Sequence, residues 1–298
     1  MWTKKMVKDA YGRETTNIRI SVTQKCNLNC LYCHREGDGN KNRSDKEISV
    51  SEIKGIMRAA SKLGIKKVKI TGGEPLLRKD IIEIVREISL TEGIKDISLT
   101  TNGFFLNKFA HLLKSNGLNR INISCDSLSS SILQKNIKNI EEGIKSAAYA
   151  GLNPLKINMV VLKGINDSEI NNMIKISKKY NAILQLIELI PTNKIFFARF
   201  FFSLEGIENE LERKANKIFT RDVNFRKQYF VDNAVVEVVR AHLNRNFCMN
   251  CRKIRITSNG FIKPCLMRND NLVKINFASD EEIMKSLLEG INMREIYY

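Results

Sequence analysis

Short apolar runs alternate with amphipathic stretches along the first two thirds of the chain. The runs are rich in β-branched residues, which is typical of strands, whereas the stretches between them repeat apolar residues at helical spacing. We expect six strands, at 17–23, 67–70, 96–100, 119–124, 155–161 and 182–189. Strands that alternate with helices predict a parallel sheet with helices outside it, either doubly wound or an incomplete (β/α) barrel.

Two of the expected helices carry start and stop signals. Ser49 and Glu52 have capping-box spacing at the start of a helix over 49–64, and a glycine ends that helix. Asp80 and Glu83 repeat the same spacing at the start of the next helix. Further helices are expected through residue 112, up to about residue 150, and over 168–180.

The pattern weakens after Pro191, where the segment 192–235 mixes polar and aromatic residues and gives no readable element order. Its IFFARFFF stretch is either a buried helix or a packing surface. A second block begins near Val235. We therefore predict two domains, residues 1–234 and residues 235–298.

The net charge of the chain and the lack of an export signal indicate which partners it can bind and in which cellular compartment it is found. The 49 Lys and Arg residues exceed the 32 Asp and Glu residues, which leaves a formal charge of +17 among 298 residues. Such an excess suits a nucleic acid, an acidic membrane or a phosphorylated small molecule, although the lysines are scattered as on a solvated surface. The N-terminus has no apolar export signal and no window resembles a membrane span, so we expect a soluble, cytoplasmic protein.

Six of the seven cysteines fall in two groups with metal-ligand spacing. The first group is C-x3-C-x2-C and the second is C-x2-C-x13-C; they consist of Cys26, Cys30 and Cys33, and of Cys248, Cys251 and Cys265. Three thiolates are one fewer than a closed metal site needs, so a [4Fe–4S] cluster held by either group keeps one iron open to a small molecule. Zinc is the alternative for each group. Cys125 stands alone and is expected to be a buried small residue.

Polar residues follow the strands at the ends where a parallel sheet binds ligands. They are the first cysteines, the TGGEP sequence at 71–75, the TTNG sequence at 100–103, and Ser124 with Asp126. The first cysteine group, the strand before it and the TGGEP after the next strand together resemble the radical S-adenosylmethionine superfamily. In that superfamily the open iron chelates the methionine moiety of the cofactor.

The resemblance implies roles for residues around the cofactor. The aromatic residue between the last two cysteines would lie by the adenine, and the Gly-Gly-Glu sequence would meet the methionine amino group. Ser124 would contact the ribose or the carboxylate of the cofactor, and Ile190 would contact the adenine. In this chain the cofactor-binding residues are then Tyr32, Gly72, Gly73, Glu74, Ser124 and Ile190. Family members tend to have methionine at the last of these positions, so only an apolar or backbone contact is expected from Ile190.

The second cysteine group and the basic run after it narrow the resemblance to the GTP 3′,8-cyclase family of molybdenum cofactor (molybdopterin) biosynthesis. This resemblance covers nearly the whole chain. It implies an incomplete (β/α)6-type barrel with a C-terminal extension that carries a second cluster, and a lyase that uses two [4Fe–4S] clusters and S-adenosylmethionine. The residues at the family's GTP-binding positions are Arg19, Lys69, Thr100, Lys156, Lys253, Ile254 and Arg255. We name no general acid or base, because the cofactor breaks the bonds.

Two departures from the family pattern bear on this site. Lys253 stands where the family has arginine, so the charge is kept but the planar bidentate fork is lost. Many members end in Gly-Gly, whereas this sequence ends MREIYY. The implied partners are GTP and a downstream cyclic pyranopterin monophosphate synthase, with a homodimer allowed, no nucleic acid and no membrane; the electron donor is not identified.

Two other functions stay open on the sequence. One is a radical S-adenosylmethionine enzyme with an auxiliary cluster that modifies a peptide or another small molecule. The other is a zinc-stabilised nucleic-acid-binding protein, which the positive charge and the C-x2-C favour but which needs no TGGEP sequence.

Overall fold

The chain builds one mixed sheet, with the strand order β12-β11-β10-β1-β2-β3-β4-β5-β6-β9-β8-β7. The computed structural model describes residues 6–37, 46–128 and 137–297. The strands are β1 (Asn17–Ser21), β2 (Lys67–Thr71), β3 (Asp96–Thr101), β4 (Arg120–Ser124), β5 (Leu155–Val161), β6 (Ile183–Glu188), β7 (Lys217–Thr220), β8 (Lys227–Val231), β9 (Ala234–Val239), β10 (Lys253–Ile256), β11 (Phe261–Lys263) and β12 (Val273–Lys274).

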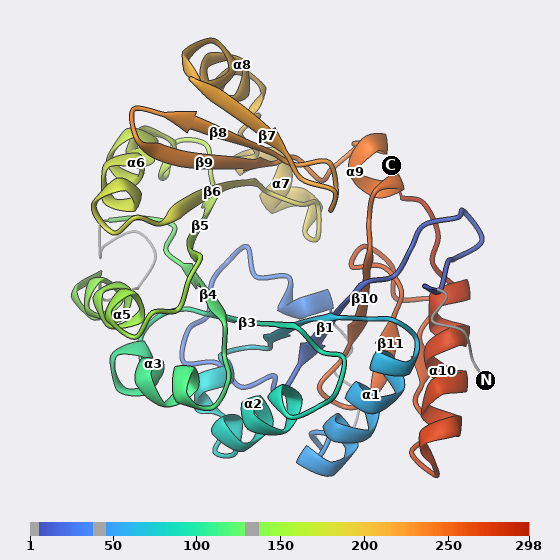
Figure 1. The fold of residues 1–298 in the computed structure, drawn as a ribbon. Helices are drawn as coiled ribbons and strands as arrows, with labels where there is room; N and C mark the ends of the chain where they lie inside the picture. The colour runs from blue at the N-terminus through green and yellow to red at the C-terminus, as the bar shows by residue number, and fades with distance from the viewer. Residues whose placement is uncertain (1–5, 38–45, 129–136, 298) are drawn as a thin grey trace.

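Helices cover the outer side of this curved sheet (Figure 1). They are α1 (Val50–Lys62), α2 (Ile81–Ser89), α3 (Leu106–Ser115), α5 (Ile137–Tyr149), α6 (Ile170–Lys179), α8 (Glu205–Lys214) and α10 (Asp280–Asn292). Two shorter helices do not lie on that side: α7 (Lys194–Phe200) follows β6, and α9 (Arg245–Met249) precedes β10. Short 3-10 turns are η1 (Arg35–Gly37), η2 (Pro75–Leu77) and η3 (Asp167–Glu169). All six expected strands are present, and the expected incomplete barrel is confirmed.

The parallel part of the sheet is larger than the six expected strands. β9 pairs in parallel with β6 at one edge, and β10 pairs in parallel with β1 at the other edge. Antiparallel strands then extend each edge, β8 and β7 beyond β9, and β11 and β12 beyond β10. In the described residues no pairing joins β7 to β12, so the barrel stays open. The C-terminal strands thus continue the barrel sheet, and the division into 1–234 and 235–298 stays a prediction.

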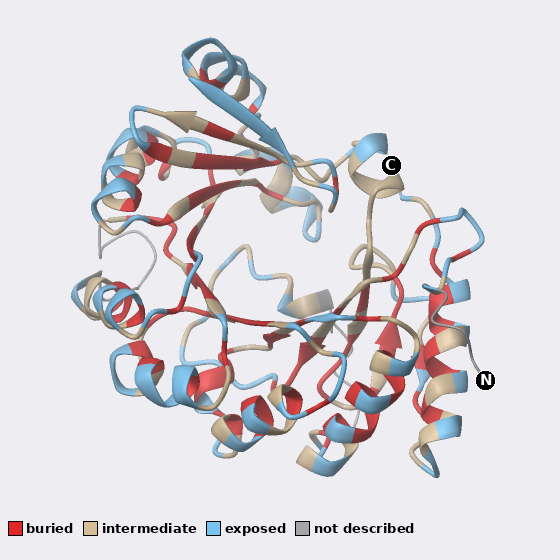
Figure 2. Cartoon of the chain, viewed as in Figure 1, coloured by how far each residue is buried: buried red, intermediate tan, exposed pale blue. Residues whose placement is uncertain are grey.

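The strands alternate between an apolar outer face and a polar inner face. On β1, Ile18 and Ile20 are fully buried in the core, while Arg19 between them is partly exposed on the other face. The same alternation places Val68 and Ile70 of β2 in the core. Figure 2 shows the buried positions following the strands and the inner sides of the surrounding helices. Apolar burial therefore holds the helices outside and leaves the barrel interior to charged and amide side chains.

The capping predictions gave two different outcomes. The Ser49 hydroxyl accepts from the backbone N–H of Glu52, and the Glu52 carboxylate accepts from the backbone N–H of Ser49, so this capping box is confirmed. The second capping box is wrong, because Asp80 makes no side-chain cap. Its carboxylate instead accepts from Arg78, with Nε–Oδ1 at 2.7 Å. The charged guanidinium outcompetes the neutral backbone amide for the carboxylate.

The structure also bears on the predictions for Cys125, for the segment 192–235 and for membrane-spanning helices. Cys125 is 3% exposed, which confirms a buried small residue. The segment 192–235, which gave no readable order, contains α7, α8, β7, β8 and the start of β9. None of the helices in the described ranges is both long enough and apolar enough to cross a membrane.

Candidate active site

The first cysteine loop leaves the carboxyl end of β1 and is fixed to the end of β2. The backbone N–H of Gly73 donates to the Thr23 carbonyl at 2.7 Å, and that of Glu74 donates to the Lys25 carbonyl at 2.8 Å. This pairing ends immediately before Cys26. The loop that carries the three cysteines therefore starts from a rigid pair of strand ends.

Two glycines make this close approach possible. A Cβ added to Gly72 would lie 2.5 Å from the Thr23 carbonyl oxygen, and Gly72 has a φ of +158°. A Cβ on Gly73 would lie 2.3 Å from the Lys25 carbonyl oxygen. Glycine is thus required here by the neighbouring chain itself, in addition to any ligand contact.

Backbone amides point at the sulfur atoms of this loop. The N–H of Leu28 donates to Cys26 Sγ at 3.4 Å, and the N–H of Arg35 donates to Cys33 Sγ at 3.4 Å. Hydrogen bonds to sulfur are one of the means by which proteins stabilise and tune iron–sulfur clusters. Burial raises the pKa of the Cys26 thiol, with the charges of Glu74 and Cys33 adding to the effect.

Glu74 and Tyr32 are held by neighbouring strand ends. The fully buried Glu74 carboxylate accepts from the Thr101 hydroxyl and from the Asn102 N–H, both at 2.7 Å. The Tyr32 hydroxyl donates to the Asp126 carboxylate. Burial and the Asp126 charge raise the pKa of Tyr32, so it remains a neutral donor. The Glu74 bonds tie the end of β2 to the end of β3, and the Tyr32 bond ties the cysteine loop to the residues after β4.

The same rim also holds two residues expected to contact the cofactor, Ser124 and Ile190, and one expected to contact GTP, Thr100. Ser124 ends β4, opposite Asn158 of β5, and Ile190 follows β6. Thr100 lies near the end of β3, opposite Asn122 of β4. All three predicted residues are partly exposed, as a ligand contact requires.

Basic side chains line the barrel interior instead of its rim. Arg19 lies in the middle of β1, in register with Lys69 of β2 on one side and with Arg255 of β10 on the other. Lys156 lies near the start of β5 and Lys253 begins β10. These cations therefore lie at several levels of the barrel and do not converge at the carboxyl ends of the strands. Strand alternation decides the outcome, because it directs every second residue inward at all levels of the barrel.

The interior carries more positive than negative charge. Burial lowers the pKa of Lys69 well below its ordinary value, and repulsion from Arg19, Arg120, Lys156 and Lys253 lowers it further. No carboxylate in the described residues forms an ion pair with Lys69 or Arg255. The Nε atoms of Arg19 and Arg255 are buried, and within the same residues they have no hydrogen-bond partner. Such an interior is suited to a polyanion.

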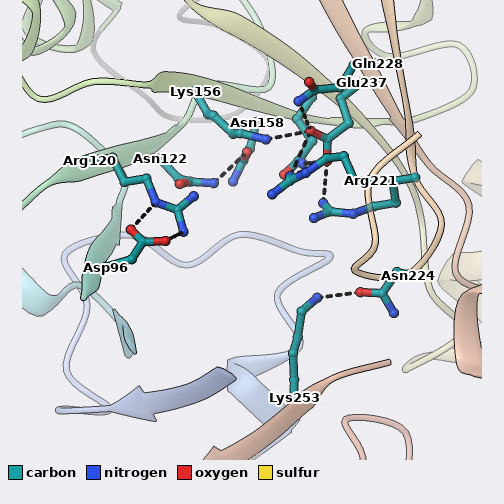
Figure 3. Close-up of polar contacts among 12 residues, drawn as sticks. Asp96, Arg120, Asn122, Lys156, Asn158, Arg221, Asn224, Gln228, Glu237 and Lys253 are labelled. Atoms are coloured by element: carbon teal, nitrogen blue, oxygen red, sulfur yellow. Dashed lines mark hydrogen bonds and ion pairs between the residues drawn. The ribbon is translucent and has the colours of Figure 1, made fainter. Parts of the chain in front are cut away.

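Three carboxylates balance part of this charge. Arg19 pairs with Glu36, and Arg120 forms a two-pronged ion pair with Asp96, both bonds being 2.6 Å. The third carboxylate is that of Glu237 on β9, which was not among the residues predicted from the sequence. It is the most heavily engaged of the three (Figure 3).

Glu237 accepts from three cations and two amides. Lys156 Nζ lies 2.5 Å from Oε2, an Arg226 nitrogen lies 2.6 Å from Oε1, and Arg221 approaches at 3.1 Å. The amides of Gln185 and Gln228 donate at 2.6 and 2.8 Å. Burial acts to raise the pKa of Glu237, but the three cations hold it well below its ordinary value. Burial lowers the pKa of Lys156 to about 7, with Glu237 opposing this shift and both arginines adding to it.

The second cysteine group lies at the opposite end of the barrel from the first. Residues 240–252 connect β9 at one sheet edge to β10 at the other, and they contain Cys248 and Cys251. Because β1 and β10 are parallel, Cys251 precedes the amino end of β10, whereas Cys26 follows the carboxyl end of β1. The interior cations therefore lie between the two groups. Burial acts to raise the pKa of Cys251, but Lys253, Arg294 and Arg255 lower it to about 7.

Lys253 and Ile254 are placed very differently. Lys253 Nζ donates to the Asn224 side-chain oxygen at 2.8 Å, and burial together with repulsion from Arg226 lowers its pKa. Ile254 is fully buried in the hydrophobic core, on the face of β10 away from the barrel interior. A contact from Ile254 to a substrate would have to come from its backbone.

The donor sets fit iron–sulfur clusters. None of the seven cysteines, all of which lie in the described residues, forms a disulfide, and each group offers three thiols. No three described His, Cys, Asp or Glu side chains converge as the ligands of a single metal ion do. A [4Fe–4S] cluster needs no such convergence, because each thiolate binds a different iron.

Comparison with known proteins assigns the family. The Radical SAM superfamily profile matches residues 20–176, and the Molybdenum Cofactor Synthesis C profile matches residues 182–296. The chain is 43% identical to the probable GTP 3′,8-cyclase of Methanocaldococcus jannaschii, over 98% of this chain and 99% of that protein. It is 46% identical to the probable GTP 3′,8-cyclase of Pyrococcus abyssi, over 98% of this chain and 100% of that protein.

The chain belongs to the GTP 3′,8-cyclase family. Its fold is also that of more distant radical S-adenosylmethionine proteins. Streptococcus suis SuiB bound to precursor peptide SuiA matches with a TM-score of 0.69 at 18% identity, over 93% of this chain and 66% of that one. The protein anSMEcpe with bound AdoMet matches with a TM-score of 0.63 at 17% identity, over 93% and 81%. These two likenesses concern the fold alone.

Several polar residues of the barrel interior in this GTP 3′,8-cyclase family member were not predicted from the sequence. Arg221, Asn224 and Arg226 come from the β7–β8 turn, in the segment whose order was unreadable. Glu237 did carry a signal, since it is the single charged residue in the apolar run AVVEVV. A carboxylate in a buried strand requires cationic partners.

Replacing Gly73 with Ala tests the packing of the first cysteine loop. The methyl group would meet the Lys25 carbonyl oxygen, so the loop must move. We expect the variant to keep only the second cluster, about half of the wild-type iron, measured by iron and sulfide analysis after anaerobic reconstitution. Gly206→Ala on α8 is the matched control, because its Cβ would meet nothing within 4 Å. Full iron in Gly73→Ala would contradict the prediction.

Replacing Glu237 with Gln tests the interior charge balance. Three cations lose their shared carboxylate, so we expect the free energy of unfolding to fall by about 3 kcal/mol. Added tripolyphosphate should raise the melting temperature of this variant more than that of the wild type, since it returns negative charge to the interior. Thermal unfolding monitored by circular dichroism measures both effects. Equal responses of the two proteins to tripolyphosphate would contradict the electrostatic explanation.

Proposed function

We propose that this protein is a GTP 3′,8-cyclase, a lyase that converts GTP to the 3′,8-cyclised nucleotide in molybdenum cofactor biosynthesis. The observation that carries the proposal is the positively charged barrel interior between two three-cysteine groups. Family membership supplies the reaction class. The charge of the interior supports a nucleotide triphosphate as the substrate.

In this proposal Cys26, Cys30 and Cys33 hold the first [4Fe–4S] cluster, beside S-adenosylmethionine. The cofactor contacts come from Tyr32, Gly72, Gly73, Glu74, Ser124 and Ile190. When bound, the cluster and S-adenosylmethionine supply the radical that removes the C3′ hydrogen of GTP. The chain contributes the orientation of the loop, through the pairing of 73–74 with 23–25 and the Tyr32–Asp126 bond.

Cys248, Cys251 and Cys265 would hold the second cluster, which receives the guanine base. The triphosphate would then lie among Arg19, Lys69, Lys156, Lys253 and Arg255, with Thr100 as a polar contact. Positive groups from β1, β2, β5 and β10 surround the interior, so they can bind a chain of three phosphates along its length. The buried Nε atoms of Arg19 and Arg255 have no hydrogen-bond partner among the described residues, so they remain available as donors.

The remaining partners follow from this reaction. A cyclic pyranopterin monophosphate synthase would consume the product, and an electron donor of unassigned identity would reduce the first cluster. We place the enzyme in the cytoplasm and allow a homodimer. The domain division at 234/235 belongs to the same proposal.

Two alternatives lead to different experiments. SuiB, a structural neighbour, was solved with its precursor peptide, and a peptide substrate would not need a run of buried cations. A zinc-stabilised nucleic-acid-binding protein would contain stoichiometric zinc and no sulfide. Metal analysis distinguishes the zinc protein from the proposed enzyme, and the nucleotide assay below distinguishes an enzyme that acts on peptides from one that acts on GTP.

Anaerobically reconstituted protein should contain about eight irons per chain and an equal amount of sulfide. With S-adenosylmethionine and a reductant, it should release 5′-deoxyadenosine in proportion to added GTP, as measured by liquid chromatography. Lys69→Ala removes an interior cation and should weaken GTP binding roughly 30-fold or more, about 2 kcal/mol. Lys179→Ala is the control, because that side chain is 61% exposed on α6. Deoxyadenosine release that ignores GTP would remove the substrate assignment.

GTP binding should also take up protons. Lys156 has a pKa of about 7 in the free protein, so at pH 8 it is largely neutral, and a bound triphosphate favours its charged form. The affinity should therefore fall as the pH rises from 7 to 9. Isothermal titration calorimetry in buffers of different ionisation enthalpy counts the protons taken up. Lys156→Arg, whose guanidinium stays charged beside Glu237, Arg221 and Arg226, should take up fewer; equal uptake would contradict the prediction.

A further inference from the structure

Two buried arginines hold the backbone of the second cysteine loop. Arg13 Nη1 donates to the Cys248 carbonyl at 3.0 Å, and Arg294 Nη2 donates to the Cys251 carbonyl. These carbonyls belong to the first and last residues of the C-x2-C sequence. Arg13 comes from the segment before β1 and Arg294 follows α10, so two segments far apart in sequence meet at this loop.

One carboxylate, that of Asp9, aligns both arginines. Asp9 Oδ2 lies 2.7 Å from Arg13 Nε and 3.2 Å from Arg294 Nη1. Asp9 Oδ1 accepts from the backbone N–H groups of Tyr11 and Arg13, which closes a tight loop around the carboxylate. Arg294 Nη1 also donates to the Thr15 hydroxyl at 2.8 Å.

This cluster of Asp9, Arg13 and Arg294 is deeply buried and carries one excess positive charge. The side chains of Asp9, Arg13 and Arg294 are 0%, 5% and 1% exposed. Excess charge at such depth is costly unless an opposite charge lies close by. The second-group thiols can supply it, since each arginine bonds to the backbone of one of these cysteines.

We propose that Asp9, Arg13 and Arg294 form a positioning cluster for the second iron–sulfur cluster. Its two arginines fix the C-x2-C backbone, and its excess positive charge stabilises the added electron when that iron–sulfur cluster is reduced. The inference rests on the proposed function, in which Cys248, Cys251 and Cys265 bind this iron. Net charge and hydrogen bonding around an iron–sulfur cluster set its reduction potential, so the three residues should control that potential.

The test uses the full chain, reconstituted anaerobically with iron and sulfide. Arg13→Gln removes one positive charge, and Asp9→Asn removes the negative charge while keeping the shape of the side chain. Arg58→Gln is the matched control, because Arg58 forms an exposed two-pronged ion pair with Asp280 on α10, away from the cysteines. The readouts are iron and sulfide content and the electron paramagnetic resonance signals of the reduced protein. A further readout is the midpoint potential of the signal from the second iron–sulfur cluster, called the second signal below.

The proposal predicts that Arg13→Gln and Asp9→Asn shift the midpoint potential of the second iron–sulfur cluster in opposite directions. Arg13→Gln should lower the midpoint potential of the second signal, or lose that signal together with half of the iron, while the first signal stays. Asp9→Asn should raise the same potential. Arg13→Lys, which restores the charge, should recover the signal. The control should match the wild type in every readout.

Several outcomes would overturn the inference. They are shifts of the same sign in Arg13→Gln and Asp9→Asn, unchanged potentials in both, and equal loss of iron from both clusters with no recovery in Arg13→Lys. Wild-type protein with only about four irons would instead remove the second cluster, and with it the proposed function. The two failures are therefore distinguishable.

Discussion

Excess positive charge inside the barrel is the constraint on which the rest of the structure depends. Lys69 and Arg255 lack an ion-pair partner in the described residues, and Glu237 alone serves three other cations. Burying unbalanced cations costs free energy, so the core outside the sheet must supply the stability that keeps them together. The apolar face of each strand does this, with Ile18, Ile20 and Ile70 fully buried. A polyanion completes such an interior.

Sheet topology explains how two cysteine groups come to face one interior. The chain leaves the sheet at β9, crosses to the other edge through α9, and re-enters as β10. This crossing sets the second group at the amino end of β10, opposite the first group. The N-terminal segment and the end of α10 then hold the crossing loop through Arg13 and Arg294. Residues far apart in sequence thus set a cysteine group at each end of the barrel interior.

Local sequence signals were reliable where neighbouring residues decide the structure. Strand periodicity and the capping box at Ser49 both depend on residues within a few positions of one another. The capping box at Asp80 was wrong because Arg78, which the pattern does not consider, takes the carboxylate. The segment 192–235 was unreadable because its strands gain their stability from β9 and not from their own composition.

The sequence by itself determined the order of the first six strands and of the helices between them, the two three-cysteine groups and the family resemblance, because each depends on local pattern and spacing. Only the tertiary structure decided where the charges go. It directed Arg19, Lys69 and Lys156 along the interior instead of to the rim, and it brought Arg226 and Glu237 to Lys156. The physical reason is that strand pairing and register between distant segments set which side chains meet, and no single segment contains that information.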